Sequence, residues 1–195
     1  MKLILLALFF PLFCFAQNGQ KKMSDGVLDS VPGTSIVLKN YEVLFQKVYT
    51  SKLSADELGK KLFTLLSTTR GFKFDRRISP AAGEFIGKLI QYDVDVQRYV
   101  ENTMFGMMGI VNYPLNASVV IHVKDFKYRV TVSDVSYNRV DTAGRSSNIK
   151  LSDYMTKKNR NGFTTGKSDM KLARVLNQDF SDKFDLQKSN LTDDF

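Results

Sequence analysis

Two neighbouring segments, residues 117–124 and 127–137, alternate apolar and polar side chains in the manner of half-buried β-strands. If residues 125 and 126 form the turn, one face of the hairpin is apolar throughout, with the pairs Val123 with Tyr128, Ile121 with Val130 and Val119 with Val132. The other face is mainly polar, with the pairs His122 with Arg129, Val120 with Thr131 and Ser118 with Ser133. A shift of one residue would mix the two faces, because side chains alternate along a strand. The chain must therefore build an antiparallel sheet that buries one face and leaves the other polar.

A helix is marked by signals at both of its ends. Ser54 stands three residues before Glu57, the spacing of a capping box in which each residue binds the other's backbone amide. Leucines then recur at helical spacing as far as Leu66, and Gly71 can adopt the left-handed conformation that ends a helix. We therefore predict a helix that begins after Ser54 and ends before Gly71.

The remaining elements complete an α+β pattern. Further strands are predicted at Tyr41–Tyr49 and in a hairpin of Phe72–Ile78 with Glu84–Tyr92. A second helix follows Ser168, because one apolar stripe runs through Leu172, Val175, Leu176, Phe180 and Phe184. The fold expected is an antiparallel sheet of four or five strands packed by two helices, in the order β-α-β-β-β-β-α.

The domain is expected to span residues 41–187 without internal repeats. Residues 138–168 are polar and basic, and we predict a long loop there with a short helical turn around residues 151–154. Residues 188–195 are predicted to form a C-terminal tail. The chain is thus expected to hold one domain of ordinary size.

The first sixteen residues have the three parts of a secretory signal: Lys2, an apolar run over residues 3–10, and small residues before Gln17. We expect export to the periplasm, cell surface or medium, removal of residues 1–16, and a tether formed by residues 17–40. Cys14, the only cysteine, would leave with the signal, so the mature chain has no disulfide. Phe13 stands where the lipoprotein peptidase expects a small residue, which argues against a lipoprotein.

The formal net charge of the chain is +8. Outside the cytoplasm, this charge suits an anionic surface component, such as lipopolysaccharide or phospholipid head groups, or simply solubility. The expected partner is such a surface component or an envelope protein. Nucleic acid is not expected as a partner in that location. A peripheral contact with a membrane stays open as an alternative.

Residues 119–134 (VVIHVKDFKYRVTVSD), together with the strand start at residues 83–87 and the capped helix before it, resemble a known family. It is a family of exported Bacteroidetes proteins of unknown function, with a fold like that of the TATA-binding protein (TBP). The resemblance covers residues 41–187 and implies this fold and an envelope location, but no catalytic residue. Phe126 stands where the family has glycine in a tight turn, and the stretch from Met104 to Leu115 is longer and more apolar than in the family.

His122, Lys124 and Arg129 share the polar face of the predicted hairpin and form a candidate site for an anion or an acidic partner. Protonation of the imidazole would make such a site sensitive to pH. The alternative is a set of solvated cross-strand neighbours. One histidine without a mature cysteine does not supply the usual zinc ligands, so no metal site is predicted.

The most unusual stretch runs from residue 104 to residue 111, where methionines alternate with glycines. Methionine side chains adapt to many apolar partners, so this stretch is a candidate docking segment or lid. Its candidate binding residues are Met104, Phe105, Met107 and Met108. The alternative is a connection between strands that covers the core, because exposed apolar runs are rare.

The sequence contains no complete catalytic set, and no cofactor is predicted. We therefore expect a non-enzymatic binding or protein-interaction module of the bacterial envelope. One alternative is a periplasmic hydrolase that uses carboxylates such as Glu84, Asp93 or Asp95. Another is a carrier of a small apolar or lipidic ligand, with residues 104–111 as its gate. Carboxylates gathered in a closed cleft would favour the hydrolase, and a deep apolar cavity would favour the carrier.

Overall fold

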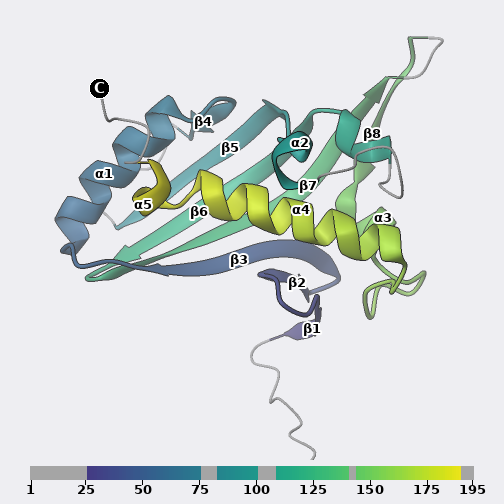
Figure 1. The fold of residues 1–195 in the computed structure, drawn as a ribbon, viewed down its shortest axis with the longest axis horizontal. Coiled ribbons are helices and arrows are strands. Elements are labelled where there is room, and N and C mark those ends of the chain that lie inside the picture. The colour runs from purple at the N-terminus through teal and green to yellow at the C-terminus, as the bar shows by residue number, and fades with distance from the viewer. Residues whose placement is uncertain (1–25, 76–82, 101–108, 141–143, 190–195) are drawn as a thin grey trace, which may run out of the picture.

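The computed structural model describes residues 26–75, 83–100, 109–140 and 144–189 (Figure 1). Its strands are β1 (Val27–Ser30), β2 (Ile36–Lys39), β3 (Glu42–Thr50), β4 (Phe72–Phe74), β5 (Glu84–Tyr92), β6 (Leu115–Lys124), β7 (Lys127–Val140) and β8 (Ser146–Lys150). Its helices are α1 (Ala55–Thr68), α2 (Val96–Tyr99), the 3-10 helix η2 (Gly109–Asn112), α3 (Leu151–Met155), α4 (Lys167–Lys183) and α5 (Leu186–Ser189). The strands form one antiparallel sheet in the order β1-β2-β3-β7-β6-β5-β4, and β8 pairs with β7. The α+β class is confirmed.

The sheet has eight strands, so the prediction of four or five strands, and of the order β-α-β-β-β-β-α, is wrong. Two of the additional strands, β1 and β2, lie in the segment 17–40 that was predicted as a tether. Ile36 and Leu38 of β2 are buried in the core, so these residues are part of the domain. A four-residue strand offers too few positions for its alternation to stand out in the sequence.

The predicted loop at 138–168 also contains regular structure, so that prediction is wrong for much of its length. β7 continues to Val140, and β8 pairs with it from residue 146 to residue 150. The short helical turn expected within this segment is confirmed as α3. Leu151 and Met155 of α3 are buried, which explains why a short helix forms in a polar region of the sequence.

The β6–β7 hairpin has the register that the sequence predicts, and all of the cross-strand pairs named above are present. Lys124 pairs with Lys127, so the loop has two residues, Asp125 and Phe126. Phe126 adopts φ 64°, a left-handed conformation that suits glycine better than an aromatic residue. The turn is therefore as tight as in the resembling family, although this chain lacks the glycine.

A β-bulge at Asp134 (φ 52°) interrupts the alternation of β7. The backbone N–H of Asp134 donates to Glu42 Oε1 of β3 at 2.6 Å. Beyond the bulge, Val135 and Tyr137 are buried, whereas before it Val130 and Val132 are buried. The bulge thus shifts the buried side chains from even to odd positions, so the whole strand keeps an apolar face toward the core.

The capping box of α1 is confirmed. The Glu57 N–H donates to Ser54 Oγ at 3.4 Å, and the Ser54 N–H donates to Glu57 Oε2 at 2.9 Å. A further contact comes from the β6–β7 turn, where Asp125 Oδ1 accepts a hydrogen bond from the Ala55 N–H at 2.8 Å. The start of the helix is therefore fixed to the tip of the hairpin.

Helices α1, α4 and α5 all lie on one face of the sheet (Figure 1). Leucines of α1 and the apolar stripe of α4 pack there against the buried side chains of the strands. No described helix combines the length and the apolar composition that crossing a membrane requires. The opposite face of the sheet carries the polar side chains of the strands.

We expect Gly87→Ala to lower the free energy of unfolding by about 1–3 kcal/mol. A Cβ atom at this position in β5 would lie 2.3 Å from Cζ of Phe72 and 2.7 Å from the backbone oxygen of Lys73. Urea unfolding followed by circular dichroism measures the change. Gly59→Ala in α1 is the control, because a Cβ there meets no atom within 4 Å, and we expect it to stabilise by about 0.5–1 kcal/mol. A Gly87→Ala variant as stable as the unmodified protein would contradict this packing.

Candidate functional site

The face of strands β3 to β7 that none of the described helices covers, which we call the polar sheet face, holds His122, Lys124 and Arg129. His122 lies between Glu84 of β5 and Arg129 of β7, its register partners on either side. His122 Nε2 is 2.9 Å from Glu84 Oε1, and Arg129 Nη2 is 3.5 Å from His122 Nδ1. Lys124 lies two residues further along β6 and is exposed. The structure therefore brings the predicted cluster together and adds a carboxylate to it.

The cations of this face stand opposite one another in the register of the sheet. Lys73 of β4 pairs with Lys88 of β5, and Lys124 of β6 pairs with Lys127 of β7. Like charges directly opposite each other in a sheet repel and are destabilising. The same face also carries the carboxylates of Glu84 and Asp134, so the two lysine pairs are its regions of unbalanced positive charge.

The second candidate segment, residues 104–111, lies only partly within the described residues. Met104, Phe105, Met107 and Met108 lie outside the described residues. The end of the same stretch forms η2, in which Ile110 and Val111 are buried in the core. For these last residues, the structure agrees with the alternative of a connection that covers the core.

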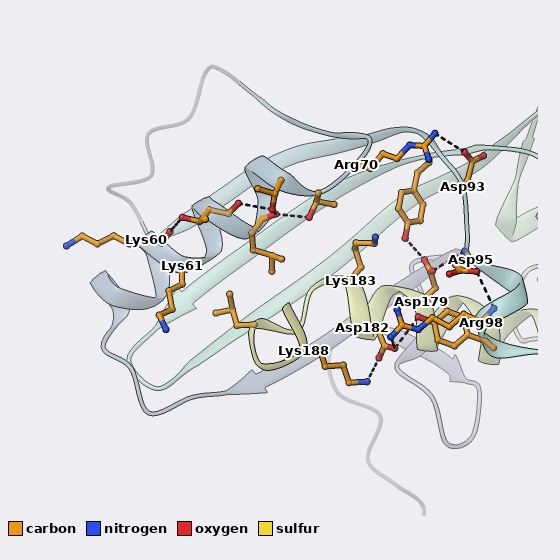
Figure 2. A pocket seen from close by; sticks show the side chains of 17 residues that line it. Lys60, Lys61, Arg70, Asp93, Asp95, Arg98, Asp179, Asp182, Lys183 and Lys188 are labelled. Carbon is orange, nitrogen blue, oxygen red and sulfur yellow. Dashed lines mark hydrogen bonds and ion pairs between the residues drawn. The ribbon is translucent and has the colours of Figure 1, made fainter. Parts of the chain in front are cut away.

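On the helix side, an open groove of about 790 Å³ lies between α1, α2, α4 and α5 (Figure 2). Its charged lining residues are Lys60, Lys61, Arg70, Asp93, Asp95, Arg98, Asp179, Asp182, Lys183 and Lys188. Leu65, Tyr92 and Leu186 add apolar surface. The groove is therefore a mixed-charge surface feature in which the cations outnumber the carboxylates.

Asp179 of α4 is the most buried carboxylate of the groove, with 3% of its surface exposed. Its Oδ2 accepts a hydrogen bond from the Tyr92 hydroxyl at 2.6 Å, and its Oδ1 accepts one from the Asp95 N–H at 3.2 Å. Burial raises the pKa of Asp179, and the hydrogen bond from Tyr92 partly offsets this effect. The carboxylate thus joins α4 to the end of β5.

Asp182, one helical turn further along α4, is surrounded by donors. It accepts hydrogen bonds from the Tyr99 hydroxyl at 3.1 Å and from the Lys188 ammonium, and Arg98 lies 3.7 Å away. Partial burial raises its pKa, but the hydrogen bonds from Lys188 and Tyr99 outweigh this and hold the pKa below its ordinary value. Asp182 is therefore a charged anchor for α2 and α5.

The three carboxylates named for a hydrolase are divided between the two faces of the sheet. Asp93 and Asp95 line the groove, whereas Glu84 pairs with His122 on the opposite face of the sheet. Within the described residues, no three His, Cys, Asp or Glu side chains form a group that could hold a metal ion. The sequence reasoning missed Asp179, although a signal was present: it stands four residues after Val175, on the apolar stripe of the helix.

The fold of this chain is similar to that of two solved structures. A TBP-like protein from Parabacteroides distasonis is 15% identical, with a TM-score of 0.52, over 76% of this chain and 94% of that chain. A DUF4468 family protein from Bacteroides ovatus is 11% identical, with a TM-score of 0.51, over 78% of this chain and 89% of that chain. This chain has a TBP-like fold. The fold expected from the resemblance of residues 119–134 is thereby confirmed.

The comparison extends to the fold and not to an activity, because one fold hosts many functions. In this chain, the antiparallel sheet carries α1, α4 and α5 on one of its faces. No protein-family model and no curated protein matches the sequence. The function must therefore be argued from the two sites of the TBP-like domain itself.

We expect Tyr92→Phe to lower the free energy of unfolding at pH 7 by about 1.5–3 kcal/mol, because the ionised Asp179 would lose a hydrogen bond in a buried site. Loss of the hydroxyl raises the pKa of Asp179 further above its unfolded value. The loss of stability caused by Tyr92→Phe is therefore largest at pH values where Asp179 is ionised. It becomes smaller as the pH falls through the pKa of Asp179 in the folded protein. Urea unfolding at pH 7 and at lower pH measures this trend.

Tyr137→Phe is the matched control. The Tyr137 hydroxyl is fully buried and has no hydrogen-bond partner in the part of the chain that the structure describes. Its removal leaves no partner unsatisfied, so we expect stability to be unchanged or slightly increased at both pH values. Equal losses in the two variants would show that the Tyr92–Asp179 bond contributes nothing specific.

Proposed function

We propose that this TBP-like protein is an exported, non-enzymatic binding module whose polar sheet face holds an acidic segment of an envelope protein. The proposal combines the secretory signal of residues 1–16, which lies outside the described residues, with the geometry of the sheet. His122, Lys124 and Arg129 are the central contacts. Lys73, Lys88 and Lys127 extend the site across the neighbouring strands.

The observation that carries the proposal is the pairing of lysine with lysine across strands. The pairs Lys73–Lys88 and Lys124–Lys127 each cost stability in the free protein, because like charges face each other. An acidic segment laid across the face would remove this repulsion and gain charge-assisted hydrogen bonds. The folded sheet thus presents a preformed site for negative charge.

Aliphatic side chains interleave with these cations. Val48 of β3 is the register partner of Arg129 and is 55% exposed, and Ile90 of β5 is 36% exposed. A protein segment with acidic and apolar side chains would use both kinds of surface, whereas a purely ionic ligand would use only the cations. The interleaving therefore favours a protein partner.

The two alternative functions find less support in the described residues. A hydrolase needs a carboxylate that is free to act. Of the carboxylates named for it, Glu84 pairs with His122, Asp95 accepts a hydrogen bond from the Arg98 N–H, and Asp93 lies 4.0 Å from Arg70. A carrier needs an apolar cavity, but the groove on the helix side is open and lined by charges. The binding module is the function that uses the observed surface most directly.

We expect Arg129→Glu to reduce partner capture about tenfold, because the charge at the centre of the site is reversed. A photo-crosslinking amino acid at Val48, beside Arg129, is introduced into the full chain in its native envelope, and the captured peptides are identified by mass spectrometry. The expected product is one partner, attached through a peptide rich in Asp and Glu. Arg129→Lys should retain capture.

Lys61→Glu supplies the control, because it makes a like-signed charge change at an exposed position on the helix side. Thermal unfolding must show that each variant is folded. Equal capture by Arg129→Glu and Lys61→Glu would overturn the proposal, as would captured peptides without acidic residues.

A further inference from the structure

Phe126, at the tip of the β6–β7 hairpin, combines two unfavourable properties. Its side chain is 60% exposed, and its backbone holds φ 64°. A left-handed backbone costs an L-residue about 1–2 kcal/mol, and glycine would avoid both this cost and the exposed ring. An aromatic residue at this position therefore brings no benefit that the isolated fold explains.

The tip is held rigidly. The Phe126 N–H donates to the Leu53 carbonyl at 3.0 Å, and the Ser51 N–H donates to the Phe126 carbonyl at 2.8 Å. Asp125 Oδ1 binds the Ala55 N–H at 2.8 Å. The ring of Phe126 is thus presented on a backbone fixed to the start of α1, which lowers the entropic cost of using it as an anchor.

The charges around the ring are cationic. Lys124 and Lys127 face each other as register partners on either side of the turn, and Lys52 lies between the two residues that bond Phe126. All three lysines are exposed. The acidic residue of the turn, Asp125, is directed to the helix N-terminus. The hairpin tip thus presents one exposed aromatic ring together with three exposed lysines.

We propose that this tip anchors the protein to an anionic lipid bilayer, with Phe126 inserted at the interface and Lys52, Lys124 and Lys127 at the head groups. An aromatic ring with flanking lysines is the amphipathic combination that binds such interfaces, and each lysine near an anionic surface contributes favourably. A hairpin end with an exposed ring can enter a bilayer without a complementary pocket, whereas a protein partner would need one. The inference goes beyond the proposed function, because it adds Phe126 and Lys52 and gives a lipid contact to the hairpin tip, which shares only Lys124 and Lys127 with the proposed protein-binding site.

The test uses the absence of tryptophan from the sequence. Phe126→Trp places one fluorophore at the tip, and Tyr41→Trp places one at a matched control position. Tyr41 is also exposed (58%) with a positive φ (64°) in the turn before β3. The hollow beside it is lined by Glu42 and Asp134 as well as by Lys150 and Arg160, so its surroundings carry charges of both signs rather than lysines alone. The mature variants are mixed with vesicles of phosphatidylcholine alone or with one-quarter phosphatidylglycerol.

The expected result for Phe126→Trp is a shift of its tryptophan emission to shorter wavelength with anionic vesicles only, and no shift is expected for Tyr41→Trp. In vesicle sedimentation, Phe126→Gly should reduce binding about tenfold, and Lys52→Glu should reduce it at least about fivefold. Phe126→Gly keeps a residue that suits the turn, and circular dichroism checks its fold. Tyr41→Gly should bind as well as the unmodified protein.

Three results would overturn the anchor. The first is an unshifted Phe126→Trp emission, and the second is sedimentation that is equal for Phe126→Gly and Tyr41→Gly. The third is loss of protein capture in Phe126→Gly with vesicle binding unchanged, which would assign the ring to a pocket of a partner protein. Arg129→Glu lies outside the tip, so its effect on protein capture tests the proposed function independently.

Discussion

The fold depends on a pair of stacked tyrosines that joins the centre of the sheet to its C-terminal helices. The rings of Tyr49 in β3 and Tyr128 in β7 lie 4.8 Å apart and nearly parallel. The Tyr49 hydroxyl donates to the Ser181 carbonyl at 3.0 Å, and the Tyr128 hydroxyl donates to the Phe184 carbonyl at 2.8 Å. Burial raises the pKa of both hydroxyls, so they remain protonated donors. They satisfy carbonyls at the end of α4 that the helix itself leaves unpaired.

Because α4 is fixed in this way, the helices gather on one face of the sheet and the core forms there. An antiparallel sheet can leave its second face in water, provided that face is polar. The same alternation that buries Val130 and Val132 then sets His122 and Arg129 outward. The polar character of this face therefore follows from one-sided packing, and its charge is set by which polar residues stand at the outward positions.

The candidate sites could be predicted only in part. The pairing of His122 with Arg129 follows from the hairpin pattern, because both residues belong to one local unit whose register has a single good solution. Glu84 joins them through β5, which is a contact between two hairpins that no local pattern specifies. Lys73 and Lys88 face each other within the predicted β4–β5 hairpin, but the sequence pattern of that hairpin does not specify its register. The groove could not be predicted from local sequence patterns, because Asp179 and Tyr92, which form a hydrogen bond in it, are 87 residues apart in the sequence.

The sequence by itself determined the β6–β7 register, the capped start of α1, the apolar stripe of α4 and the α+β class. Each of these depends on the spacing of residues within a few helical turns or a few cross-strand pairs. Only the tertiary structure decided that residues 27–39 and 146–150 add strands to the sheet. These strands are short, and burial of residues such as Ile36 and Leu38 against distant elements stabilises them. The tertiary structure also decided the bulge at Asp134 and the rigid turn at Phe126, because each is held by hydrogen bonds to residues far away in the sequence. Long-range contacts, not local propensity, set these features.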